Sequence, residues 1–390
     1  MERTEARFDG TELAAASFTA GGVTETHLFA KGGEGDFARQ LGGVVGALDA
    51  YLRENGVARG AVAFARYFVS DYANQAGALR DIVECGATCA LSIVQQPPLG
   101  GGKVAAWFYV IDDRTGVPST AEAVPGSAPG GGLRLKRGAY EHLWCTRLTS
   151  GDGAADSFQQ TARIFADYGD RLERHGCTLK DNLVRTWLFV KDIDSDYQGL
   201  VDARREFFHG HGMTERTHYV SSTGIGGRAS DPRVNVLMDA YAVKGVSPRQ
   251  IRFLQAPERL NPTHEYGVTF ERGTGVDYGD RRHVFISGTA SIDRAGGILH
   301  ENDVRRQTDR ALENVEALLA DGGATVGDVA QMIVYLRDGA DAQAVAERLC
   351  GGWRAVPKVV VLAPVCRPGW LVEVECIAVA PASNPGFASF

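Results

Sequence analysis

Residues 304–338, VRRQTDRALENVEALLADGGATVGDVAQMIVYLRD, carry the pattern that organises the whole chain. Two earlier segments repeat it: FARQLGGVVGALDAYLRENGVARGAVAFARYFVSD at residues 37–71 and SFQQTARIFADYGDRLERHGCTLKDNLVRTWLFVKD at residues 157–192. In each segment a glutamine precedes a glycine by 16 residues, with helical apolar spacing between them and a β-rich run ending in aspartate soon after. The pattern therefore indicates one module that is repeated three times along the chain.

The glycines in this pattern, Gly56, Gly176 and Gly323, are expected to end the helices in a left-handed conformation. After the aspartate, each copy has a second helix-like piece and then a strand, a loop and a strand; strand-like runs also precede the first helix. In chain order these pieces lie at residues 13–29, 72–83, 89–110, 142–148, 197–209, 218–243, 283–292, 341–349 and 358–379. The module therefore reads β-β-α-β-α-β-β, an α+β unit with helices on one face of a mixed sheet.

Glycine- and proline-rich stretches at residues 115–132 and 245–262 are expected to link the copies. They divide the chain into residues 1–132, 133–248 and 249–390, of which the first copy is the most divergent. The repeat spacing is too long and too uneven for a solenoid. Three linked copies are expected to form a pseudo-trimer, either as a monomer, because its internal interfaces are already satisfied, or in a larger homo-oligomer.

Composition narrows the class of function. The 390 residues are 44% hydrophobic and 23% charged, as in ordinary globular proteins, and the formal net charge of −7 offers no general basic field for nucleic acid. The N-terminal residues do not resemble a signal peptide, and no apolar run is long enough to cross a bilayer, so the cytoplasm is the expected location. Seven cysteines without a CxxC pair indicate neither a zinc site nor a disulfide framework.

The last strand of the third copy, around LVEVECIAV, carries the candidate chemistry. Alternation along a strand places Glu373 and Glu375 together on one face. In a poorly solvated cleft each carboxylate would raise the pKa of the other, and a carboxylic acid protonated near neutral pH is a candidate general acid. The alternative is that the two glutamates lie on a solvated sheet face or pair with a base such as Arg367.

The third copy resembles the Rid superfamily (reactive intermediate deaminases, or YjgF family) over about residues 266–380. The motifs are VFISGTASID, HENDVRRQTDRALENVEALLADGGA, MIVYLRD and LVEVECIAV. The resemblance implies three Rid-like modules, also described as chorismate mutase-like, with sites in the clefts between them. It implies that a Glu and an Arg in such a cleft hold a substrate carboxylate and position the water that hydrolyses an imine or enamine. Glu373 matches that Glu, and Lys358 takes the place of that Arg.

Four short motifs also resemble the chorismatases, Rid-like enzymes that hydrolyse or rearrange the enol ether of chorismate. They are RTW at residues 185–187, TGIG at 223–226, SGTA at 287–290 and VEVE at 372–375. They occur in the same order as in that family. The resemblance implies that Glu373 is the acid that starts the reaction.

Only the third copy has Glu at the acid position; the matching strands, KVAAWFYV from residue 103 and VNVLMDAYAV from residue 234, have apolar residues there. We therefore expect one main cleft. One wall would hold Lys358, Glu373 and Ser287, and the facing wall Arg185 with the glycine-rich stretch SSTGIGGR, residues 221–228.

The predicted catalytic residues are Glu373, Glu375 and Lys358. The remaining candidates are expected to bind substrate; they are Arg185, Gly224, Gly226, Ser287, Arg337, Arg272 and Cys366. Glycines that tolerate positive φ would let the 221–228 backbone approach an anion, although a plain hairpin turn explains them equally well. Arg185 and Arg337 have an alternative role as ion-pair partners of Asp192 or Asp338.

The leading hypothesis is a cofactor-independent hydrolase or lyase that protonates an enol ether or enamine in a small carboxylate substrate. One alternative is a Rid-type imine deaminase in which Lys358 replaces the Arg. The other is a module that binds a small carboxylate without turnover. No metal or organic cofactor is expected, since His209, His211 and His218 lack the spacing of a metal site. Some Rid proteins are described as ribonucleases, but the acidic charge argues against an RNA partner.

Overall fold

Three six-stranded mixed sheets form the chain, one from each module, in a computed structural model that describes residues 1–125, 127 and 130–390. The strand order is the same in all three: β1-β2-β3-β6-β4-β5, β7-β8-β9-β12-β10-β11 and β13-β14-β15-β18-β16-β17. One neighbouring pair in each sheet is parallel, β4 with β5, β10 with β11 and β16 with β17, and the others are antiparallel. The threefold α+β architecture is therefore confirmed.

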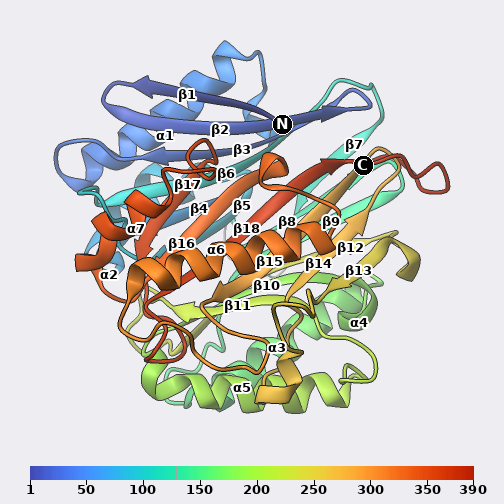
Figure 1. Cartoon of the computed structure of the whole chain (residues 1–390). Helices are drawn as coiled ribbons and strands as arrows, with labels where there is room; N and C mark the ends of the chain where they lie inside the picture. Colours follow the sequence, from blue (N-terminus) through green and yellow to red (C-terminus); the bar gives the residue numbers. More distant parts are fainter. Residues whose placement is uncertain (126, 128–129) are drawn as a thin grey trace.

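The elements of the first module are β1 Glu2–Phe8, β2 Thr11–Ala20, β3 Val23–Lys31, α1 Phe37–Glu54, β4 Val62–Val69, α2 Tyr72–Ile82, β5 Ala90–Gln95 and β6 Val104–Asp113. Those of the second are β7 Ser119–Ala123, β8 Gly132–Arg137, β9 Tyr140–Leu148, α3 Ser157–Arg174, α4 Leu179–Asn182, β10 Leu183–Val190, α5 Ile193–Gly210, β11 Ser221–Gly226 and β12 Val236–Lys244. Those of the third are β13 Ile251–Leu254, β14 Gly273–Asp277, β15 Arg281–Ala290, α6 Val304–Asp321, β16 Val329–Leu336, α7 Ala342–Arg348, β17 Lys358–Leu362 and β18 Val372–Pro381. Figure 1 shows α6 lying across the third sheet and α3 beside α5.

Each module has one strand more than the sequence predicted, because β1, β7 and β13 precede the two expected strands. These edge strands are poorly buried, and all five residues of β7 are exposed, so they lack the apolar alternation that marks a half-buried strand. The stretches expected as linkers, residues 115–132 and 245–262, contain β7 and β13. Residues 126, 128 and 129 of the first stretch lie outside the described part of the chain.

The repeated glutamine and glycine have clear structural roles. Gly56, Gly176 and Gly323 have φ values of 64°, 66° and 71°, which confirms the predicted left-handed helix ends. The glutamine amides tie the first helix of each module to the backbone that leads into its last strand. In the third module, Gln307 accepts a hydrogen bond from the Leu371 amide at 2.8 Å and donates to the Gly369 carbonyl at 2.9 Å. The glutamine recurs because its buried side-chain amide both accepts and donates a hydrogen bond.

One buried ion pair between an arginine and an acid crosses each of the three interfaces between modules. The pairs are Arg66–Asp239 at 2.9 Å, Arg185–Glu375 at 2.7 Å and Arg281–Glu25 at 2.6 Å. All six side chains are at most 1% exposed. Removal of one partner from such a pair costs about 3–5 kcal/mol, because the other charge is left buried without a partner.

Candidate active site

The two glutamates of β18 lie on one face of the strand, as the alternation predicted, and both are buried. They differ in their partners. Glu375 accepts hydrogen bonds from Arg185 Nη2 and from Trp187 Nε1, each at 2.7 Å, and from the Thr223 hydroxyl. All three donors come from the second module, so Glu375 is held as an ion-paired carboxylate at the interface between modules 2 and 3.

Glu373 lies nearer the surface, where it lines a pocket between modules 2 and 3. Burial raises the pKa of Glu373 to about 8, the negative charge of Glu375 adds to the effect, and Arg185 and Arg272 oppose it. A group with this pKa keeps its proton at neutral pH and can donate it. Glu373 is therefore suited to general acid chemistry.

The pocket around Glu373 has a cavity volume of about 40 Å³. Its walls come from α5 and β11 of the second module and from β15, β18 and three loops of the third. The lining residues are Tyr197, Arg204, Ser222, Thr223, Gly224, Val268, Phe270, Arg272, Gly288, Ala290, Ile292, Cys366, Arg367, Trp370 and Glu373.

Gly288 makes room for the acid. A Cβ built at this position would lie 2.8 Å from the Glu373 Cδ and 3.1 Å from the Thr223 Cγ2. The Gly288 amide donates to the Thr223 hydroxyl at 2.9 Å, and the same hydroxyl bonds Glu375. The glycine of the SGTA motif thus links the backbone of the third module to both glutamates.

Two buried arginines bring positive charge to the pocket. The predicted residue Arg272 is 4% exposed and donates from Nε and Nη2 to the Asn261 carbonyl at 3.2 and 3.1 Å. Arg204, which sequence reasoning missed, is 2% exposed and donates to the Thr269 and Ser222 hydroxyls. A signal for Arg204 exists in the sequence, because it lies on the same buried face of α5 as Leu200 and Phe208, where a charge is unusual.

Cys366 and Trp370 close the pocket from the loop between β17 and β18. Burial, followed by the charge of Glu373, raises the pKa of Cys366 to about 12, so its thiol is neutral at physiological pH. The Trp370 indole donates to the Ser291 carbonyl at 3.1 Å, and Arg367 lies over its ring. Cys366 therefore lines the pocket, as expected, together with aromatic surface that the sequence did not assign to the site.

Lys358 does not lie beside Glu373, contrary to expectation. Its Nζ donates to the Arg354 and Val356 carbonyls at 2.9 and 2.8 Å, and burial together with the nearby Lys31 lowers its pKa to about 8. Lys358 is the first residue of β17. Val361, three residues further along β17, pairs with Tyr335, and Tyr335 pairs on its other side with Glu373. Lys358 therefore faces the first module instead of the pocket.

Three other predicted residues have bonds that hold the modules together. Arg185 pairs with Glu375 and does not line the pocket. The Ser287 hydroxyl donates to the Glu271 carbonyl at 2.6 Å and accepts from the Ser222 amide at 2.9 Å. Arg337 forms an ion pair at 2.8 Å, with Asp194 of the second module instead of the aspartates considered from the sequence.

The glycine-rich stretch 221–228 is mainly a strand, β11, and forms neither a hairpin turn nor an anion-binding loop. β11 runs parallel to β10, and none of its glycines has a positive φ. Gly224 lines the pocket, and its small size lets Tyr197 approach, since a Cβ there would lie 3.0 Å from the Tyr197 Cε2. Gly226 instead donates to the Pro364 carbonyl at 2.9 Å and packs against that proline.

The other two interfaces lack the acid. Glu373 pairs with Tyr335, the penultimate residue of β16. The penultimate residue of β10 pairs with Leu237, and the penultimate residue of β4 pairs with Ala105. Both are apolar, as the sequence indicated. Chemistry that needs a carboxylic acid at this position is confined to the pocket between modules 2 and 3.

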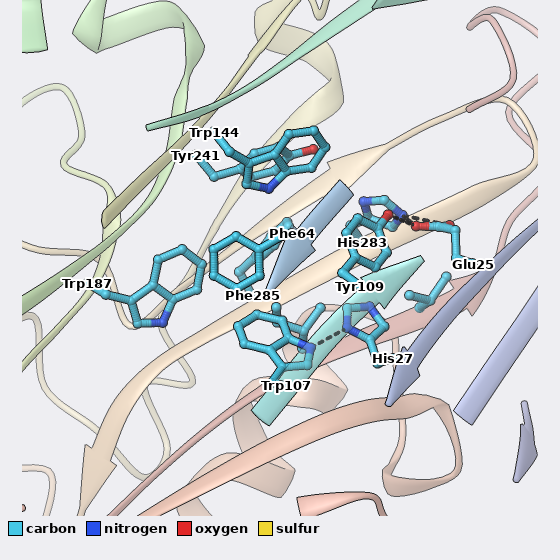
Figure 2. Close-up of a pocket in the computed structure, with 12 residues that line it drawn as sticks. Glu25, His27, Phe64, Trp107, Tyr109, Trp144, Trp187, Tyr241, His283 and Phe285 are labelled. Carbon is cyan, nitrogen blue, oxygen red and sulfur yellow. Dashed lines mark hydrogen bonds and ion pairs between the residues drawn. The ribbon is translucent and has the colours of Figure 1, made fainter. Parts of the chain in front are cut away.

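A further cavity, of about 30 Å³, lies where the three sheets meet. Figure 2 shows aromatic rings from all three modules around it, with Glu25 beside His283 and Tyr109. Arg281 donates to Glu25 at 2.6 Å, and together with His283 it holds the pKa of Glu25 well below its ordinary value against the effect of burial. Burial lowers the pKa of His27 to about 3, so that ring is neutral. This paired network belongs to the packing between modules.

Among the described residues, no three His, Cys, Asp or Glu side chains gather as metal ligands would. None of the helices in the described part of the chain has both the length and the apolar character needed to cross a bilayer.

Comparison with known proteins finds relatives of the third module and of more than half of the chain. Residues 275–380 match the family model Ribonuc_L-PSP, endoribonuclease L-PSP. The 3-hydroxybenzoate synthase of Streptomyces hygroscopicus is 27% identical over 239 residues, covering 56% of this chain and 68% of that protein. A RutC family protein of Pyrococcus abyssi (strain GE5 / Orsay) is 38% identical over 55 residues, which cover 14% of this chain and 43% of that protein.

The fold of the whole chain is that of a solved chorismatase. The two structures align with a TM-score of 0.62 at 20% identity, over 82% of this chain and 93% of the other. The third module therefore matches the L-PSP family model, and the chain as a whole has a chorismatase-like fold made of three linked modules.

Proposed function

We propose that the chain is an enzyme that acts on chorismate, in the pocket between modules 2 and 3, and releases pyruvate from it. The observation that carries the proposal is Glu373, a buried acid with a pKa of about 8 in a pocket that also contains Arg204 and Arg272. Chorismate has two carboxylates for the arginines and an enol ether whose methylene carbon accepts a proton. The relatives named chorismatase and 3-hydroxybenzoate synthase support this substrate.

In the proposed reaction Glu373 is the general acid. Its proton forms a C–H bond with the methylene carbon of the enol ether, using the π electrons of that double bond, and the O–H electron pair remains on Glu373 as a carboxylate. The ether oxygen shares the resulting positive charge. The new Glu373 carboxylate and the nearby Glu375 stabilise this cation electrostatically.

Two outcomes follow from that cation. Addition of water to the charged carbon, and then cleavage of its bond to the ether oxygen, yields pyruvate and a dihydroxycyclohexadiene carboxylate. Without water, the bond between the ring carbon and the ether oxygen breaks, and its electron pair completes the carbonyl group of pyruvate. The neighbouring ring hydroxyl oxygen bonds to that ring carbon and returns its proton to the Glu373 carboxylate, which forms an epoxide. Breaking of the epoxide's other C–O bond and transfer of one ring hydrogen to oxygen then give aromatic 3-hydroxybenzoate with no net consumption of water. The relative named 3-hydroxybenzoate synthase favours the second outcome, so we propose 3-hydroxybenzoate as the product.

The structure does not favour imine deamination through Lys358, because Lys358 lies away from the pocket. Binding without turnover is the remaining alternative, and it predicts a bound carboxylate without pyruvate release.

The test is to incubate the purified chain with chorismate, measure pyruvate by a coupled dehydrogenase assay, and identify the ring product by chromatography and mass spectrometry. Loss of the general acid in Glu373→Gln is expected to lower kcat by about 10²–10⁴-fold. Glu258→Gln, on the exposed surface of the same module, is the matched control and should keep full activity. Pyruvate release at the wild-type rate by Glu373→Gln would refute the assigned role.

A further inference from the structure

A row of side chains crosses the second sheet from the interface with module 1 to the interface with module 3. Trp187 of β10 stands in the middle of this row. It pairs with Asp239 of β12 on one side and with Thr223 of β11 on the other. Because paired residues on neighbouring strands project from the same face of a sheet, the three side chains lie next to one another.

Each end of the row meets one of the buried ion pairs between modules. At one end, Asp239 pairs with Arg66 of module 1 at 2.9 Å. At the other end, the Thr223 hydroxyl donates to Glu375, the acid of the ion pair between modules 2 and 3. Trp187 therefore stands between the two ion pairs.

Trp187 contacts both ion pairs through different parts of its side chain. The guanidinium carbon of Arg66 lies 4.6 Å from the centroid of the Trp187 ring, and the indole Nε1 donates to Glu375 Oε1 at 2.7 Å. Arg66 is 0% exposed and Trp187 is 3% exposed, so water does not screen either contact. A cation that lies over an indole ring in such a dry environment makes a strong cation–π interaction.

The two contacts of Trp187 reinforce each other. A cation over the face of the ring draws electron density from the indole, which makes its N–H group a better donor to a carboxylate. That carboxylate, Glu375, lies two residues from Glu373 on the same strand, and its charge is one cause of the raised pKa of Glu373. The chain of contacts thus runs from a charge on module 1 to the neighbour of the acid.

We propose that Arg66 of module 1 is a positioning residue for the site between modules 2 and 3, where it fixes Glu375 through the Trp187 ring. Module 1 has no acid at the Glu373 position, and Arg66 gives it a part in the chemistry of that site. Arg66 does not line the Glu373 pocket, so it acts without touching the substrate. The effect on turnover rests on the proposed function, whereas the effect on Trp187 is measurable without it.

The direct measurement is the indole N–H resonance of Trp187 in the NMR spectrum of the chain with isotope-labelled tryptophan, assigned with Trp187→Phe. The test variant combines Arg66→Met with Asp239→Asn, which removes both charges of the ion pair and leaves neither one buried alone. The resonance should move upfield in this variant, because the hydrogen bond to Glu375 becomes weaker. An unchanged resonance would overturn the proposal.

Two further variants frame that measurement. Arg66→Lys keeps a cation for Asp239 but loses the planar guanidinium over the ring, so it should shift the Trp187 resonance in the same direction with less disturbance of the fold. Arg137→Met combined with Asp113→Asn removes another largely buried ion pair between modules 1 and 2, and this control should leave the resonance in place. A shift of equal size in the control would contradict a specific role of Arg66.

Turnover of chorismate supplies the second measurement. The test variant should lower kcat for pyruvate release about tenfold, the scale of one desolvated cation–π contact, and leave KM unchanged. Trp187→Phe lacks the N–H donor and should lower kcat as well. Adding the test variant to Trp187→Phe should cause no further loss, because both changes act through one hydrogen bond.

The outcomes separate this inference from the proposed function. Losses in kcat that multiply when the test variant and Trp187→Phe are combined would show that Arg66 acts independently of Trp187 and would overturn the inference. Absence of pyruvate release from the wild type would instead refute the proposed function, and the indole resonance would still decide whether Arg66 fixes Glu375 through Trp187.

Discussion

Replacement of Glu373 by glutamine should stabilise the fold while it removes the acid. Burial, followed by the charge of Glu375, raises the pKa of Glu373 from 4.5 to about 8. Between these two values the folded chain binds more protons than the unfolded chain, so the wild type loses stability as the pH rises through this window. Glutamine has nearly the same shape and does not titrate there, so the variant escapes that loss.

The size of the effect follows from the two pKa values. At 1.36 kcal/mol for each unit, the advantage of the variant in free energy of unfolding is about 1 kcal/mol near pH 5.5 and grows to about 5 kcal/mol near pH 9. Urea unfolding of both proteins at several pH values measures this difference. Glu258→Gln, on the exposed surface, should show no such growth. A difference between Glu373→Gln and the wild type that stays constant or shrinks with rising pH would refute the buried, protonated state of Glu373.

Other substitutions test the surroundings of the acid. Glu375→Gln removes a negative charge about 7 Å from Glu373 along the strand and leaves Arg185 unpaired. The repulsion between the two carboxylates is worth about 2 kcal/mol, which corresponds to about 1.5 units in the pKa of Glu373. The pKa of Glu373 should fall, so the alkaline loss of pyruvate release should move to lower pH; an unchanged pH profile would contradict this coupling. Gly288→Ala places a Cβ against the Glu373 carboxyl group and should lower kcat by at least tenfold in the same assay, so wild-type kcat would contradict the contact. Lys358→Met should leave kcat and KM unchanged because Lys358 faces the first module. A large rise in KM would instead indicate that Lys358 contacts the substrate.

Much of the architecture could be predicted from local patterns. The spacing of Gln307 and Gly323, and of their two counterparts, indicated the helix of each module, because a buried amide and a left-handed glycine have strict local requirements. The alternation of Glu373 with valines likewise placed the two glutamates on one face of β18. The edge strands β1, β7 and β13 were missed because exposed residues carry no periodic apolar signal.

The contents of the pocket depended on contacts between modules. Arg204 and Glu373 are 169 positions apart in the chain and line one pocket only because β11 and α5 pack against β15 and β18. Arg185 was expected in the wall of the cleft, but the structure pairs it with Glu375 outside the pocket, so Arg272 and Arg204 are the buried arginines that line the pocket.

The sequence by itself determined the threefold repeat, the strand that carries the acid and the absence of that acid from the other two copies. Each of these follows from the periodic spacing of residues along a helix or a strand. Only the tertiary structure decided that Lys358 faces the first module and that Glu375 is ion-paired while Glu373 stays protonated. Those outcomes depend on which modules meet and on how much water they exclude, and no local pattern encodes either.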